Sequence, residues 1–191
     1  MKLGAHKLRK LNDASGQKIQ KEIKPHPIFI VLENVVDTYN VGGFFRLADA
    51  VAAEKLYLCG QTQTPPDKKI LKASVGTYRL VPWEYKENVD ISVAELRKIK
   101  NMNVIAVEQN RKAINYTKVK YSFPIAFIFG NETFGMTPSA LKLADAIVEI
   151  PLYGVNKSLN VMIAAGIVLY RTLEQADAYK LTLSGSKKMH A

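Results

Sequence analysis

Cysteine and histidine are scarce in this chain of 191 residues, and their scarcity excludes several kinds of site. The one cysteine, Cys59, cannot form a disulfide within the chain, and its place at the end of an apolar run predicts a buried structural thiol. The three histidines, His6, His26 and His190, have no cysteine or carboxylate at ligand spacing. We therefore expect neither a metal site nor a histidine-based catalytic triad.

Long apolar runs and acidic residues are also lacking. No stretch of about 18 apolar residues is free of charge, and no apolar core follows the basic N-terminus. We therefore expect no transmembrane span and no secretory signal, and hence a cytoplasmic protein. Lys and Arg total 27 against 17 Asp and Glu, a formal net charge of +10, which favours polyanionic partners, nucleic acid before a membrane surface.

The charge is unevenly distributed along the chain. Residues 1–26, the basic arm, hold seven basic and two acidic residues and so carry half of the net charge. The arm is either a solvated, partly helical tail or a contact to an RNA backbone. The length of the chain favours one compact domain, which we place at residues 27–179, followed by a basic C-terminal tail at 180–191.

Apolar runs alternate with helical patterns from Pro27 onward. This alternation predicts an α/β fold, with a mostly parallel sheet covered by helices on both faces. Ligands of such sheets bind at the carboxyl ends of the strands. The expected strands are 28–32, 55–59, 78–81, 103–107, 125–129 and 146–150, and the expected helices begin at Val41 or cover 92–100, 138–144 and 158–179.

The segment from Asn34 to Arg46 is the first that could carry chemistry. Asn40 is expected to cap a helix with one apolar stripe, and Arg46 projects away from that stripe toward the side where the loop can meet it. A simple cap and a solvated arginine is the plainer interpretation. The pair Gly42-Gly43 lacks the G-x-G-x-x-G spacing of a dinucleotide site, so we do not expect one.

Two further segments follow predicted strands. Gly130 permits close approach of a ligand, and Glu132 either accepts a hydrogen bond and orients Arg46 or is an ordinary turn carboxylate. Thr137 and Pro138 predict the start of a helix. The strand that ends at Ile150 runs into a polar loop and then into an apolar helix, which Ser158 is expected to cap.

Taken together and in this order, the three segments resemble the three motifs of the SpoU branch of the SPOUT RNA methyltransferases. The resemblance covers residues 28 to 175. It rests on N-x-G-x-x-x-R (Asn40, Gly42, Arg46), G-N-E-x-x-G (Gly130, Asn131, Glu132, Gly135) and I-P-x-x-G-x-x-x-S-L-N (Ile150, Pro151, Gly154, Ser158, Leu159, Asn160).

The resemblance implies a SPOUT fold, in which the C-terminal part of a parallel sheet is tied in a deep trefoil knot, against the usual rule that chains do not thread loops. It also implies a homodimer that packs its knots together, which suits the apolar helix from Ser158. S-adenosylmethionine would be held bent among the knot loops, largely by backbone groups. The implied cofactor contacts are Val107, Glu108, Gly130, Ile150, Leu152, Ser158 and Leu159.

The implied reaction transfers the methyl group of S-adenosylmethionine to a ribose 2′-hydroxyl of RNA. Arg46 is the family's candidate for activating that hydroxyl, but guanidinium groups stay protonated at neutral pH. We therefore hypothesise that Arg46 binds the adjacent phosphate and stabilises the developing alkoxide, while Asn40 holds Arg46 and the ribose. The remaining candidates, Glu132, Ser158 and Asn160, would shape the pocket.

Two alternatives remain at this point. A non-catalytic RNA-binding module that keeps the fold explains the basic charge equally well, and thermal shift with S-adenosylmethionine would separate it from the enzyme. A base-methylating relative would share the knot but is not expected to combine Asn40, Arg46 and the Ser158-Leu159-Asn160 sequence. Among RNA substrates, tRNA is favoured over rRNA, because the chain has no room for a separate RNA-binding domain.

Overall fold

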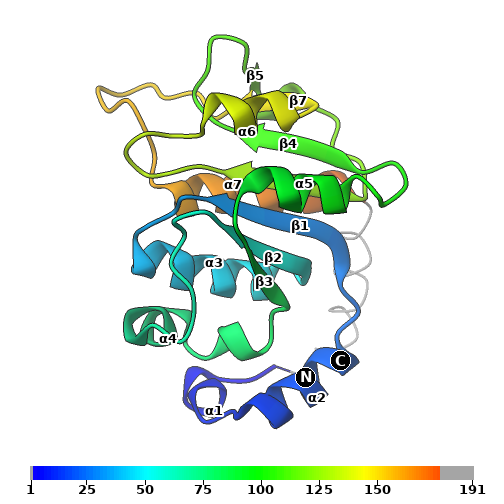
Figure 1. Ribbon diagram of the computed structural model, residues 1–191, viewed down its shortest axis with the longest axis vertical. Coiled ribbons are helices and arrows are strands. Elements are labelled where there is room, and N and C mark those ends of the chain that lie inside the picture. The colour runs from blue at the N-terminus through cyan, green and yellow to red at the C-terminus, as the bar shows by residue number, and fades with distance from the viewer. Residues whose placement is uncertain (1, 177–191) are drawn as a thin grey trace, which may run out of the picture.

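The computed structural model describes residues 2–176, which form a single seven-stranded sheet with helices on both faces (Figure 1). The strand order is β3-β2-β1-β6-β4-β7-β5, and every neighbouring pair is parallel. The strands are β1 (His26–Glu33), β2 (Ala53–Cys59), β3 (Trp83–Lys86), β4 (Asn103–Val107), β5 (Ile114–Asn115), β6 (Ile125–Phe129) and β7 (Ala146–Glu149). The helices are α1 (Ala5–Arg9), α2 (Asp13–Glu22), α3 (Thr38–Ala50), α4 (Lys68–Ser74), α5 (Val89–Leu96), α6 (Pro138–Leu143) and α7 (Val161–Gln175), with short 3-10 turns η1 (Thr77–Arg79) and η2 (Tyr116–Lys118).

The central strands β1 and β6 divide the hydrophobic core in two. Successive side chains of a strand point to opposite faces of the sheet. Ile28, Ile30 and Leu32 of β1 therefore join the core under α3, α4 and α7, whereas Phe29 and Val31 join the core under α5 and α6. All five residues of β6 are buried. The predicted parallel α/β fold is confirmed, and within the described chain no pairing between named strands is antiparallel.

Helix α3 lies close to its two neighbours, α4 and α7, because of its glycine pair. A Cβ at Gly42 would meet Ala73 Cβ and the backbone of α4, and a Cβ at Gly43 would meet the side chain of Met162 on α7. Side chains at these positions would therefore push the helices apart. The Gly42-Gly43 pair thus serves helix packing.

Several expected elements begin or end elsewhere. The predicted strand 78–81 is wrong, because this segment contains the turn η1 and the strand follows it at Trp83. The helix expected at 92–100 covers Val89–Leu96 with Asn88 as its cap, and the helix expected at 158–179 begins at Val161 and ends at Gln175. Two short elements, α4 and β5, were not expected. The predicted cap at Thr137 with Pro138 in the first turn of α6 is confirmed, as is the burial of Cys59.

The basic arm folds into α1 and α2, which pack at the end of the molecule beyond α4 (Figure 1). A Cβ at Gly16 of α2 would lie 2.6 Å from the carbonyl oxygen of Arg79, so α2 contacts η1 directly. The guanidinium of Arg79 also pairs with Asp13 at 3.0 Å. The tail at 180–191 lies outside the described residues, and the division into arm, domain and tail stays a prediction, as does the knot. No helix within residues 2–176 is long and apolar enough to span a bilayer.

We predict that Gly42→Ala destabilises the chain more than Gly43→Ala does. The methyl group at position 42 meets Ala73 and the α4 backbone, which are stiff, whereas at position 43 it meets a flexible methionine. Overpacking of this kind costs about 1–3 kcal/mol. Urea unfolding of both variants measures the difference. Equal stability of the two variants would contradict the inferred α3–α4 contact.

Candidate active site

A cleft of about 780 Å³ opens at the carboxyl edge of the sheet. It lies where β4, β6 and β7 end and where α3 and α7 begin, as expected for a ligand site of a parallel sheet. The structure brings nine of the eleven predicted site residues to this one cleft: Asn40, Val107, Glu108, Gly130, Glu132, Ile150, Ser158, Leu159 and Asn160. The roles given to these residues stay predictions.

A chain of side-chain hydrogen bonds joins the three motifs across the cleft. Asn40 Nδ2 donates to Glu132 Oε1 at 3.0 Å, and Asn160 Nδ2 donates to Asn40 Oδ1 at 3.0 Å. The carboxylate of Glu132 also accepts the backbone N–H groups of Val36 and Asp37, at 3.3 and 3.1 Å. Side chains separated by more than 90 positions thereby fix the first turn of α3 against the 130–135 loop and the start of α7.

The two helices that open on the cleft are capped by other residues than expected. Asp37, not Asn40, caps α3, because its Oδ1 accepts the Tyr39 N–H at 2.7 Å. Asn160, not Ser158, caps α7, because its Oδ1 accepts the Met162 N–H at 2.9 Å. Asn40 is thereby left free to join the side-chain network. Both helix N-termini face the cleft and contribute partial positive charge there.

The loop after β6 is held in place by Glu108, the residue that follows the neighbouring strand β4. Glu108 Oε2 accepts the Met136 N–H at 2.9 Å, and Glu108 Oε1 accepts the N–H of Gln109 at 3.0 Å. A Cβ at Gly130 would lie 2.6 Å from the backbone of Gly135. The absence of a side chain at Gly130 therefore allows the loop to fold back so that Gly135 packs against Gly130. The predicted cofactor contact Glu108 therefore also positions the loop that carries Glu132.

One cleft residue that the sequence did not single out is Gln109. Its Nε2 donates to the carbonyl oxygen of Ile150 at 2.8 Å, which is one of the backbone groups predicted to hold the cofactor. Asp37 likewise lines the cleft without having been predicted. Gln109 is the second residue after β4, and Asp37 directly precedes α3. Their position at the carboxyl edge of the predicted sheet is the signal in the sequence that could have identified them.

Two predicted residues lie outside the cleft. Arg46 is exposed on α3 and Leu152 is half-buried in the loop after β7, and neither lines the cleft wall. Glu132 does not bond to Arg46, since its carboxylate is occupied by Asn40 and two backbone N–H groups. Helix geometry places Arg46 one turn after Gly42, on the side of α3 between α4 and α7.

The size and charge of the cleft suit a cofactor with a cationic centre. Its volume falls within the range of about 300–1,000 Å³ typical of small-molecule sites. Asp37, Glu108, Glu132 and Glu149 line it against one cation, Lys157, so its wall is predominantly acidic. Such a lining fits a positively charged sulfonium and amino group. In the described part of the chain, no three His, Cys, Asp or Glu side chains are grouped so that they could hold a metal ion.

Known proteins are similar to this chain in sequence and in fold. The chain matches the model of the SpoU rRNA Methylase family over residues 27–170. It is 30% identical over 159 residues to the tRNA (guanosine(18)-2′-O)-methyltransferase of Aquifex aeolicus, covering 82% of this chain and 73% of that protein.

Solved structures agree with this relationship. The crystal structure of an A. aeolicus TrmH/SpoU tRNA modifying enzyme superimposes with a TM-score of 0.74 at 25% identity and covers 86% of each chain. An AdoMet-bound rRNA methyltransferase from Sinorhizobium meliloti gives a TM-score of 0.72 at 27% identity, covering 82% of this chain and 60% of that one.

The fold and the cleft are those of an α/β enzyme that binds its ligand at the carboxyl edge of a parallel sheet. Within that class, the chain belongs to the SpoU methylase family.

We predict that Asn40→Ala destabilises the protein by about 1–3 kcal/mol, because it removes one of the three hydrogen-bond donors to Glu132 and leaves the Asn160 Nδ2 group without an acceptor in a partly buried site. Asn156→Ala, in an exposed part of the same cleft, serves as the control and should change stability by less than about 0.5 kcal/mol. Urea unfolding at pH 7 measures both values. Equal effects would show that the network contributes nothing to stability.

We also predict a pH-dependent effect of Asn40→Asp. The introduced carboxyl would face Glu132, and repulsion would raise its pKa above the value in the unfolded chain. The folded state then binds more protons, so the destabilisation is largest at pH 7 and decreases as the pH falls toward 5. Unfolding at the two pH values, relative to the unsubstituted protein, measures this change, and a pH-independent loss would contradict it.

Proposed function

We propose that this protein transfers the methyl group of S-adenosylmethionine to a ribose 2′-hydroxyl of tRNA or rRNA. The observation that carries the proposal is the hydrogen-bonded chain Glu132–Asn40–Asn160, which unites the three family motifs on the wall of one acidic cleft. Membership of the SpoU methylase family supports the same reaction. Because this reaction acts on cellular RNA, a cytoplasmic location is part of the proposal.

The cofactor would supply an electrophilic methyl group, and the protein would supply position and electrostatic stabilisation. Backbone groups of Gly130, Ile150 and Leu159 would hold the cofactor, with Val107, Glu108, Leu152 and Ser158 nearby. Holding two reactants in line for attack can contribute about 7–11 kcal/mol to a rate enhancement. Glu132 is hydrogen bonded through both oxygens and therefore orients Asn40 rather than accepting the proton of the hydroxyl.

Arg46 has a separate role in this proposal, which its place outside the cleft suits. An exposed guanidinium on α3 is free to bind the phosphate beside the target ribose and to stabilise the alkoxide as it forms. The planar fork of arginine is needed for two parallel bonds to one phosphate. Arg46 therefore belongs to the RNA side of the site, and Asn40 to the side that organises the cleft.

Labelled-methyl transfer onto total RNA, followed by nuclease mapping of the modified nucleotide, tests the reaction. A 2′-O-methylated ribose in tRNA or rRNA is the expected product, with tRNA favoured by the A. aeolicus relative and rRNA by the S. meliloti structure. A methylated base would support the base-methylating alternative instead. An RNA-binding module without activity would show neither transfer nor a thermal shift with S-adenosylmethionine.

We predict that Arg46→Ala abolishes methyl transfer and leaves binding of S-adenosylmethionine nearly intact, because Arg46 does not line the cleft. Arg46→Lys retains the charge and loses the fork, so it should restore only part of the activity. Single-turnover transfer and calorimetric cofactor binding measure the two effects separately. Normal turnover by Arg46→Ala would remove Arg46 from the mechanism.

We further propose that the protein is a homodimer. The outer face of α7 and the loop before it carry apolar side chains in contact with solvent: Tyr153 at 96% exposure, Tyr170 at 52% and Ile163 at 49%. Gly166, between the last two, has open space where a Cβ would lie, which leaves room for close approach of another chain. Exposed apolar surface of this kind marks an interface.

We predict that Ile163→Glu combined with Tyr170→Glu converts the dimer to monomers, because it places charge in the proposed interface. Ile91→Glu, on α5 at 43% exposure, is the matched control and should leave the dimer intact. Sedimentation equilibrium measures the molecular mass. A monomeric unsubstituted protein, or a dimeric double variant, would contradict the proposed interface.

A further inference from the structure

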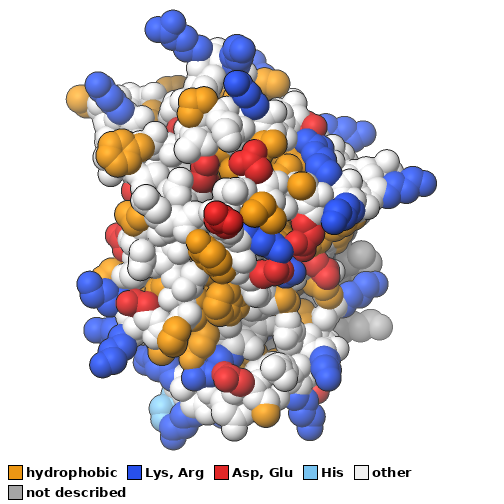
Figure 2. Space-filling model, viewed as in Figure 1, with side chains coloured by type: hydrophobic (Ala, Val, Ile, Leu, Met, Phe, Trp, Pro, Cys, Tyr) orange, Lys and Arg blue, Asp and Glu red, His pale blue; other side chains and the backbone are white. Residues whose placement is uncertain are grey.

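Two short helices far apart in the sequence place a group of unpaired cations on one surface. All six of these side chains are exposed. We call them the α1–α4 basic surface, which consists of Lys7, Arg9 and Lys10 at α1 and Lys68, Lys69 and Lys72 on α4. Blue side chains gather over these two helices at the lower left of the space-filling view (Figure 2).

The two helices are joined by a close backbone contact. Gly76, at φ +94° just after the end of α4, lies directly against the backbone of Leu8 in α1, and a Cβ there would meet the Leu8 carbonyl oxygen. Ile70 of α4 is fully buried in the core, so α4 is fixed to the catalytic domain. The basic surface is therefore a folded feature that spans the arm and the domain.

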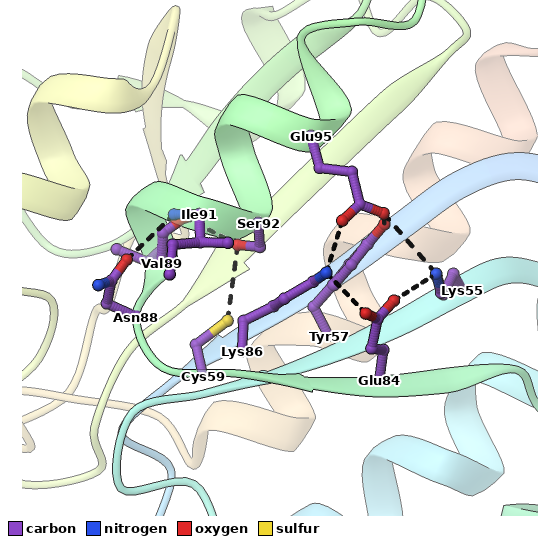
Figure 3. A network of polar contacts seen from close by, with 10 residues as sticks. All are labelled: Lys55, Tyr57, Cys59, Glu84, Lys86, Asn88, Val89, Ile91, Ser92 and Glu95. Atoms are coloured by element: carbon purple, nitrogen blue, oxygen red, sulfur yellow. Dashed lines mark hydrogen bonds and ion pairs between the residues drawn. The ribbon is translucent and has the colours of Figure 1, made fainter.

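Several cations elsewhere on the protein are paired with carboxylates. Lys86 Nζ lies 2.6 Å from both Glu84 and Glu95, and Lys55 Nζ lies 2.7 Å from Glu84 (Figure 3). Within residues 2–176, none of the six cations of the α1–α4 basic surface forms an ion pair of this kind. Asp67 is adjacent in sequence, but its carboxylate caps α4 by accepting two backbone N–H groups.

Helix stability does not explain these cations. Lys7, Arg9 and Lys72 lie in last turns, where positive charge is favourable, but Lys68 and Lys69 lie in the first turn of α4, where it is unfavourable. Lys68 and Lys72 are also four residues apart, and like charges at that spacing repel. The arrangement therefore costs stability in the isolated protein and calls for an anionic partner.

The basic surface adjoins the candidate active site. Helix α4 packs on α3 at Gly42, two residues from Asn40 in the cleft wall and one turn from Arg46. An RNA whose target ribose lies at the cleft, with its neighbouring phosphate at Arg46, would extend over α4 and then α1. Phosphate contacts of this kind set the position and affinity of a nucleic acid without reading its sequence.

We propose that the α1–α4 basic surface binds the phosphate backbone of the substrate RNA beside the target nucleotide. The inference rests on the proposed function and adds to it where the RNA lies. It assigns the basic arm to substrate binding, through the three cations that it contributes. Both helices then act on RNA affinity, whereas the cleft acts on the cofactor.

The test compares two triple variants of equal charge change. Lys68→Gln/Lys69→Gln/Lys72→Gln removes half of the basic surface, and Lys98→Gln/Lys100→Gln/Lys142→Gln removes three exposed lysines after α5 and on α6, which lead to the amino ends of β4 and β7. The first should raise KM for RNA at least about tenfold at physiological salt and lower the slope of log affinity against log salt by about 2–3. The value of kcat at saturating RNA and the thermal shift with S-adenosylmethionine should not change, and the control should resemble the unsubstituted protein.

An equal KM and an equal salt slope in the two triple variants would overturn the proposal. If the α4 variant is less stable than the control, Lys7→Gln/Arg9→Gln/Lys10→Gln on α1 provides the same test from the other helix. RNA binding is also measured directly by fluorescence anisotropy. A chain without methyl transfer whose RNA affinity still depends on these lysines would contradict the proposed reaction and support the basic surface.

Discussion

The candidate site depends on the two hydrogen bonds of the Asn40 side-chain amide. Its nitrogen donates to the Glu132 carboxylate and its oxygen accepts from Asn160, so both ends of the amide are used. An aspartate lacks the donor, and a glutamine places the same group one methylene further away. This one side chain therefore fixes the relative positions of α3, the loop after β6 and the start of α7, which together form much of the cleft wall.

Whether Asn40 lies within hydrogen-bond distance of Asn160 depends in turn on how closely α3 packs against its neighbouring helices. Gly42 and Gly43 remove side chains from the two flanks of α3, so α4 and α7 approach its backbone. If α7 were displaced outward by the volume of a side chain, Asn160 would move away from Asn40, because Asn160 caps α7 and moves with it. Helix packing and site geometry are thus coupled through a pair of glycines that does not line the cleft.

The sequence predicted the fold well where local and tertiary signals agree, and less well where they compete. Continuous apolar runs identified the buried strands, since a parallel sheet buries both faces of its central strands. Tyr78 to Val81 is typical of a strand in composition, but Val75 and Gly76 have left-handed backbone conformations and a turn follows them, where α1 packs against Gly76. The two wrong cap predictions, at Asn40 and Ser158, have a related cause. Asp37 and Asn40 are both plausible caps of α3, and Ser158 and Asn160 are both plausible caps of α7. The hydrogen bonds across the cleft decide between them. The position of Arg46 outside the cleft wall depends on how α3 is rotated about its own axis. The spacing of the apolar residues of α3 predicts this rotation only approximately.

The distribution of charge shows how a basic protein can keep an acidic cleft. The carboxylates of Glu132 and Glu108 accept backbone N–H groups of the protein itself, which compensates part of their negative charge within the cleft wall. Their field therefore extends less far toward the phosphates of an approaching RNA than that of free carboxylates would. The lysines of α1 and α4 are unpaired and exposed, so their field extends into solvent within the screening length of about 8 Å at physiological salt. A cationic cofactor and a polyanionic substrate can then be attracted to adjacent parts of one surface, because the negative charge is confined by hydrogen bonds and the positive charge is not.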